Sequence, residues 1–159
     1  MVISDLSEMA PTEAGRIMKV GGRPEIRRRL MDMGVVAGAV VEVKRVAPLG
    51  DPVEIRIKGY DLALRKEEAR KIQVEVTRGS LSRVAAGEKA VIVAMKAGWG
   101  MQHRRAELGL TSGTVVKVVN SGCPGGVVLE VRGSRLAIGH GVAGKIIVQP
   151  EGVEAVDQA

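Results

Sequence analysis

The sequence Met33-Gly34-Val35, followed by Gly38, returns 75 residues later as Leu108-Gly109-Leu110, followed by Gly113. Landmarks that come after these are 74 residues apart, as in Gly59 and Gly133. One residue is therefore missing from the second copy between the two sets of landmarks. Because a repeat of this length exceeds the usual unit of a solenoid, it predicts two small duplicated domains rather than a stacked array.

The repeat also predicts where the domains begin and end. We expect a first domain at residues 1–76, a second at residues 81–149, a linker at residues 77–80 and a flexible tail at residues 150–159. Each domain is near the lower size limit for an independent hydrophobic core.

Each copy has the pattern of short strands with one short helix. In the first copy, Val53, Ile55 and Ile57 alternate with charged residues, which is typical of a half-buried strand. Pro24 suits the first turn of a helix, and Gly34 suits the residue just after its end. Five short strands with one helix after the first predict a mainly β fold, in which each copy is a small, partly open barrel.

Composition narrows the classes of function. The formal net charge is +6, which is compatible with nucleic acid, an acidic protein face or an anionic membrane surface as partner. Trp99 and Tyr60 are the only aromatic residues, which argues against stacking of single-stranded bases. A single cysteine, the lack of a long apolar run and the lack of a signal sequence at residues 1–5 predict a cytoplasmic protein without a membrane span.

Several motifs of the first copy, in this order, resemble the FeoA domain family: residues 6–9, 29–38, 47–55 and 62–69. The second copy resembles it more loosely, through residues 104–113 and 136–138. The resemblance implies SH3-like β-barrels and a cytoplasmic accessory protein of ferrous iron uptake. It also implies a partner, the FeoB-type permease, which carries a cytoplasmic GTP-binding domain. A related barrel occurs in iron-dependent repressors, so a metal-binding or metal-sensing regulatory module is the alternative.

The second copy departs from the family pattern in three places. Arg105 takes the place of Leu30, an expected core residue. The loop at residues 48–52 is replaced by residues 121–126, and Lys66-Glu67-Glu68 by Gly139-His140-Gly141. These changes favour the first copy as the domain that contacts a partner.

The sequence offers no recognisable catalytic arrangement, and we expect a protein that is not an enzyme. Candidate metal ligands, for Fe²⁺ or another divalent transition metal, are His103, Cys123 and His140. No close ligand pair accompanies them, so two surface histidines and a loop thiol are the simpler interpretation.

The clearest polar feature is the basic cluster Arg27-Arg28-Arg29 in the first copy. It is interpreted either as a solvated helix face, paired with Asp32 or Glu25, or as a docking surface for an acidic partner or a membrane surface. The candidate partner-binding residues are Arg27, Arg28, Arg29, Met31, Leu49 and Trp99. Nucleic acid is not expected as a partner, and the sequence leaves the oligomeric state open.

Overall fold

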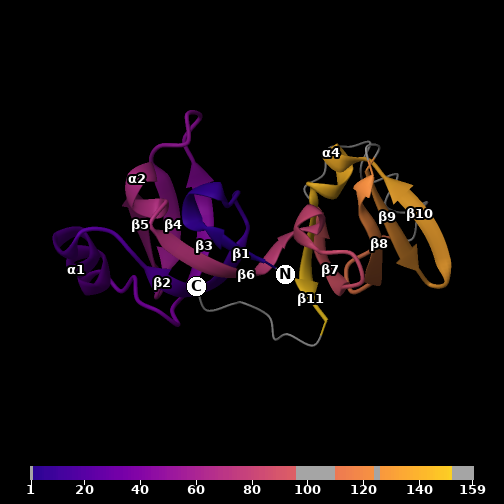
Figure 1. The fold of residues 1–159 in the computed structure, drawn as a ribbon, viewed down its shortest axis with the longest axis horizontal. Helices are drawn as coiled ribbons and strands as arrows, with labels where there is room; N and C mark the ends of the chain where they lie inside the picture. Colours follow the sequence, from indigo (N-terminus) through magenta and orange to yellow (C-terminus); the bar gives the residue numbers. More distant parts are fainter. Residues whose placement is uncertain (1, 96–109, 124–125, 152–159) are drawn as a thin grey trace. The chain divides into compact units, whose positions relative to one another are not determined.

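The structure is a computed structural model that describes residues 2–95, 110–123 and 126–151. The chain divides between Thr77 and Arg78 into two compact units, each built mainly from antiparallel strands (Figure 1). We refer to them as the first barrel and the second barrel. Both are small, partly open barrels of the SH3-like class, which confirms the predicted fold class.

The first barrel consists of short strands, one α-helix and two single turns of helix. Its strands are β1 (Ile3–Asp5), β2 (Ala14–Val20), β3 (Val40–Val46), β4 (Val53–Ile57), β5 (Tyr60–Leu64) and β6 (Ile72–Ser80). Its helices are η1 (Leu6–Glu8), α1 (Pro24–Asp32) and α2 (Lys66–Ala69). The strands are arranged in the order β1, β6, β2, β3, β4 and β5, which leaves β5 at an open edge.

Alternating side chains form the core of the first barrel. Val53, Ile55 and Ile57 of β4 are fully buried, as their alternation with charged residues predicted. Helix α1 contributes Leu30, which is also fully buried. Close packing of β2 against β6 depends on Gly15, because a Cβ atom there would lie 2.2 Å from the backbone oxygen of Glu75.

The second barrel repeats this arrangement. It contains η2 (Leu81–Arg83), β7 (Lys89–Met95), β8 (Val115–Cys123), β9 (Gly126–Val131), β10 (Ser134–Ile138), α4 (His140–Ala143) and β11 (Ile146–Pro150). Its core residues are contributed by η2, α4 and all five of these strands, together with Val84 and Leu110. The short helix expected in the second copy, as the counterpart of α1, falls outside the described residues.

The four residues expected to form a linker are strand instead. Residues 77–80 continue β6, and Gly79 and Ser80 pair with Val148 and Ile147 of β11. In the first barrel, Ser4 and Asp5 of β1 make the equivalent pairs with Val74 and Gln73 of β6. The end of β6 is therefore the first strand of the second barrel. The sequence did not indicate this strand, because residues 77–80 have no alternation of apolar and polar residues. At the other end, Pro150 of the predicted tail belongs to β11.

Candidate partner-binding surface

Helix α1 presents most of its length to solvent because a single residue anchors it. Pro24 occupies the first turn, and the amide of Val35 closes the other end by donating to the Leu30 oxygen at 2.9 Å. Gly34 has the left-handed φ of +93° that such a helix end requires, as predicted. Since Leu30 is the buried residue of the helix, the arginines around it project outward.

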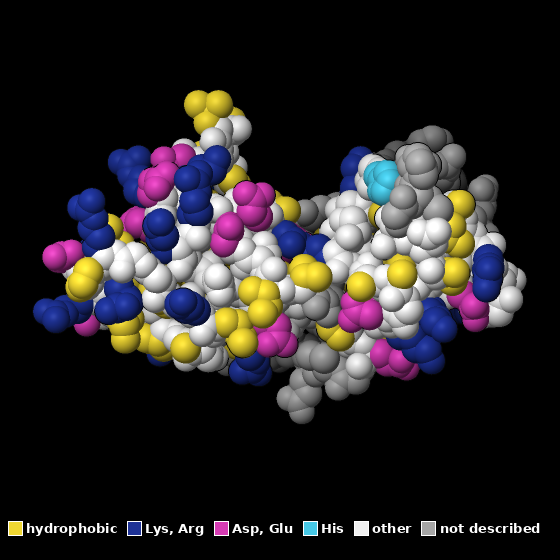
Figure 2. Space-filling view, in the orientation of Figure 1, with side chains coloured by type: hydrophobic (Ala, Val, Ile, Leu, Met, Phe, Trp, Pro, Cys, Tyr) yellow, Lys and Arg dark blue, Asp and Glu magenta, His cyan; other side chains and the backbone are white. Residues whose placement is uncertain are grey.

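Two of the three clustered arginines have no ion-pair partner among the described residues. Arg27 and Arg28 are exposed, and no carboxylate in that part of the chain pairs with either one. Figure 2 shows Lys and Arg side chains over the region of α1 and α2, with Asp and Glu side chains among them. A solvated face neutralised by Asp32 or Glu25 would pair these arginines with one of those carboxylates. Because neither pair is found among the described residues, we keep the docking interpretation for Arg27 and Arg28.

Arg29 differs from its two neighbours, because it forms an ion pair with Glu68 of α2. The Glu68 side chain is only 12% exposed, whereas that of Arg29 is 60% exposed. The second carboxylate oxygen of Glu68 accepts a hydrogen bond from the backbone amide of Arg65 at 3.0 Å. Glu68 therefore joins the start of α2 to the last turn of α1, a contact that sequence reasoning did not identify.

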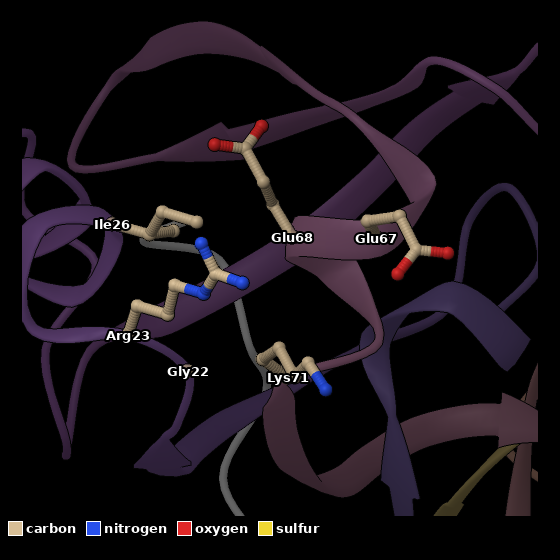
Figure 3. Close-up of a pocket in the computed structure, with 6 residues that line it drawn as sticks. All are labelled: Gly22, Arg23, Ile26, Glu67, Glu68 and Lys71. Atoms are coloured by element: carbon tan, nitrogen blue, oxygen red, sulfur yellow. The ribbon is translucent and has the colours of Figure 1, made fainter.

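A cleft of about 520 Å³ lies between the beginning of α1 and α2. It is lined by Gly22, Arg23, Ile26, Glu67, Glu68 and Lys71 (Figure 3). Arg23 and Lys71 supply cations and the two glutamates supply anions, so the cleft has no net charge of one sign. Glu67 is already engaged, because its carboxylate pairs with Arg70 at 3.2 Å. Because the two glutamates pair with Arg29 and Arg70, neither Arg23 nor Lys71 has an ion-pair partner among the described residues, and unpaired basic charge borders the cleft as well as the outer face of α1.

Two of the predicted apolar contact residues are exposed. Met31 of α1 is 49% exposed, and Leu49 in the loop between β3 and β4 is 91% exposed. That loop extends away from the strands in Figure 1. The base of the loop is hydrogen-bonded to α2, because Asp51 accepts a hydrogen bond from the backbone amide of Lys66 at 3.2 Å. The remaining candidate, Trp99, lies outside the described residues.

Of the three candidate metal ligands, the structure describes the side chain of His140 alone. His140 is an exposed residue at the start of α4, whereas His103 and the side chain of Cys123 lie outside the described residues. Within the described ranges, no three His, Cys, Asp or Glu side chains are grouped as metal ligands would be. None of the described helices is long and apolar enough to cross a membrane.

The second barrel does not reproduce the polar groups around α2. Helix α4 begins at His140 as α2 begins at Lys66, so Gly141 and Val142 stand at the positions of Glu67 and Glu68. This correspondence differs by one residue from the one expected, which placed Gly139 opposite Lys66. Val142 has no carboxylate, so it cannot form the counterpart of the ion pair that Glu68 makes in the first barrel.

The fold and this surface define a class of protein: two duplicated SH3-like barrels, of which the first presents a basic helix face to solvent. A family profile, the FeoA domain, matches residues 5–76 and again residues 79–150. The chain therefore belongs to the FeoA domain family, as its motifs indicated.

The chain is also similar to individual proteins. A fusion of Fe(2+) transport protein A with the Fe(2+) transporter FeoB, from Porphyromonas gingivalis, is 44% identical over 71 residues. That match spans 45% of this chain but 8% of the fusion protein. The solution structure of iron(II) transport protein A from Clostridium thermocellum is 30% identical, with a TM-score of 0.57, and covers 98% of this chain and 95% of its own. A FeoA from Stenotrophomonas maltophilia, described as a prokaryotic SH3 domain protein, is 28% identical over 44% of this chain and 87% of its own, with a TM-score of 0.40.

Proposed function

We propose that this chain is a cytoplasmic accessory protein of ferrous iron uptake that acts by binding the cytoplasmic part of a FeoB-type permease, without catalysing a reaction itself. The first barrel makes the contact through the outer face of α1, with Arg27, Arg28 and Met31, and through Leu49 in the loop between β3 and β4.

The observation that carries this proposal is the fusion protein. Its name records a FeoA part and a FeoB part in one chain, and the stretch that resembles our protein is 71 residues, the size of one barrel. A covalent connection keeps two domains at high local concentration, which favours a direct contact between them. We infer the same contact for our protein.

The surface chemistry supports the first barrel as the contact. Arg27 and Arg28 are exposed without an ion pair among the described residues, and they attract an acidic partner face. Leu49 is 91% exposed, and a large apolar side chain so placed gains most when a partner covers it. Arginine with neighbouring apolar side chains is a common composition of protein interfaces.

Binding at this surface would act on the permease through its GTP-binding domain. A bound protein shifts a two-state equilibrium only by its difference in affinity for the two states. We therefore infer that the first barrel prefers one nucleotide state of that domain and so changes its rate of GTP hydrolysis or its gating.

A binding assay with the full chain tests the proposal. The cytoplasmic part of the cognate permease is immobilised, and its affinity for the wild type is compared with that for Arg27→Ala/Arg28→Ala and for Leu49→Ser. Both variants should bind at least tenfold more weakly. Arg135→Ala/Lys145→Ala, which removes the same charge from exposed residues of the second barrel, is the matched control and should bind as the wild type does. Absence of binding by the wild type would refute the proposal.

A further inference from the structure

Strand β5 leaves one edge of the first barrel without a neighbouring strand. It pairs with β4 from Ile57 opposite Tyr60 to Val53 opposite Leu64. No other strand of the described residues pairs with it, since β5 ends the strand order. An open edge of this kind offers backbone donors and acceptors to an extended segment of another chain.

The register identifies the backbone groups that face outward. Ile57 and Tyr60 flank a two-residue turn, so they form a hydrogen-bonded pair of the antiparallel ladder. Hydrogen-bonded pairs alternate along such a ladder, which directs the amides of Leu62 and Leu64 toward β4. The amides and carbonyls of Asp61 and Ala63 therefore point to the open edge. Both residues are exposed, and among the described residues no hydrogen bond to their amides or carbonyls is found outside the ladder.

A groove of about 350 Å³ lies beside the end of this edge. Ala63 and Leu64 of β5 form one wall with Arg65, and Arg29 and Met33, at the end of α1, form another together with Glu68. The groove thus lies between the open strand edge and the end of the helix whose outer face carries the proposed contact. Its small residue, Ala63, leaves room for a backbone to approach β5.

Charge defines the segment that fits this groove. Of the three charged side chains that line it, Arg29 and Glu68 neutralise each other. The remaining one, Arg65, is exposed and has no ion-pair partner among the described residues. An extended segment that pairs with Asp61 and Ala63 and carries a carboxylate beside Arg65 satisfies the free backbone groups and the free charge together.

We propose that β5 binds an extended acidic segment of the partner by strand addition, with hydrogen bonds to the backbone of Asp61 and Ala63 and a carboxylate at Arg65. This inference rests on the proposed function, because the partner is the cytoplasmic part of the permease. It deepens that function by naming the form of the recognised segment and the edge that receives it.

Amide hydrogen exchange, measured by NMR on the full chain with and without the cytoplasmic part of the cognate permease, tests strand addition directly. The amides of Asp61 and Ala63 should exchange rapidly in the free protein and at least tenfold more slowly in the complex. Those of Leu62 and Leu64, already bonded to β4, serve as internal references. Binding without slower exchange at Asp61 and Ala63 would overturn strand addition and leave the proposed function intact.

Variants provide a second, independent measurement. Ala63→Pro removes the outward amide and should weaken binding at least tenfold, since proline is tolerated on an edge strand where its nitrogen faces solvent. Ala137→Pro, at the equivalent position of β10 in the second barrel, is the matched control and should bind normally. Arg65→Glu, which leaves the backbone of β5 unchanged, should also weaken binding at least tenfold. Wild-type affinity of both Ala63→Pro and Arg65→Glu would overturn the inference, whereas no binding by the unmodified chain would overturn the proposed function with it.

Discussion

Glu68 of α2 pairs with Arg29 of α1 and simultaneously accepts a hydrogen bond from the amide of Arg65. The glutamate is largely buried, and the arginine lies at the edge of the basic surface on α1. This one carboxylate therefore joins the two helices that border both the cleft and the groove. Arg29 also differs from Arg27 and Arg28, because this carboxylate already neutralises its charge within the barrel.

Two substitutions of Glu68 should destabilise the first barrel to different extents. Glu68→Gln keeps an oxygen for the Arg65 amide but loses the ion pair, so the free energy of unfolding should fall by about 1 kcal/mol. Glu68→Ala loses both contacts and should cost about 2 kcal/mol. Urea denaturation of the full chain measures the difference. Arg28→Ala, which breaks no ion pair, is the control and should change stability by less than about 0.5 kcal/mol. Equal stability of Glu68→Gln and Glu68→Ala would show that the hydrogen bond to Arg65 contributes nothing.

Exchange of one small residue should destabilise both barrels, but to different extents. Gly15 in β2 corresponds to Ala90 in β7, and a Cβ atom at Gly15 would lie 2.2 Å from the backbone oxygen of Glu75. Gly15→Ala should therefore force β2 and β6 apart and cost about 2 to 3 kcal/mol. Ala90→Gly introduces no clash and should cost about 1 kcal/mol. Thermal unfolding of both variants checks this, and a Gly15→Ala protein as stable as the wild type would contradict the close approach of the strands.

A tight turn recurs in both barrels with a residue that is poorly suited to it. Lys58 and Gly59 have φ angles of +51° and +84°, and Arg132 and Gly133 have φ angles of +51° and +80°. A two-residue hairpin turn of this type favours Asn before Gly, because Asn tolerates the left-handed conformation better than Lys or Arg. Arg132→Asn should therefore raise the free energy of unfolding by about 0.5 kcal/mol. The same measurement on Lys58→Asn tests the equivalent turn, and lower stability of both variants would count against this explanation.

The repeat and the strand alternation were sufficient to predict two small, partly open barrels, and the resemblance to the FeoA family added their SH3-like class. Local patterns placed the start and end of α1 and the strand from Val53 to Ile57 as they are observed. These elements depend on neighbouring residues, which is why a single sequence reveals them. Residues 77–80 were misassigned as a linker because their strand is defined by pairing with β11, far away in the chain.

The candidate surface was predictable only in part. The three consecutive arginines indicated a basic helix face, but their sequence neighbours suggested Glu25 or Asp32 as ion-pair partners. The observed partner of Arg29 is Glu68, which only the tertiary fold brings to α1. The free edge of β5 was likewise not visible in sequence, since it follows from the order of strands in the sheet.

The exposed arginines of α1 should act mainly on the rate at which the proposed complex forms. Charges at the border of an interface steer the approach of a partner, whereas buried contacts determine how long the complex persists. Arg27→Ala/Arg28→Ala should therefore lower the association rate constant about tenfold in low salt and change the dissociation rate constant less. Surface plasmon resonance with the cytoplasmic part of the cognate permease measures both constants. At ~0.5 M NaCl, where exposed charges are screened, the association rates of wild type and variant should converge. A tenfold difference that persists in high salt would mean that these arginines act chiefly through their short-range contacts in the complex and not by long-range steering of its formation.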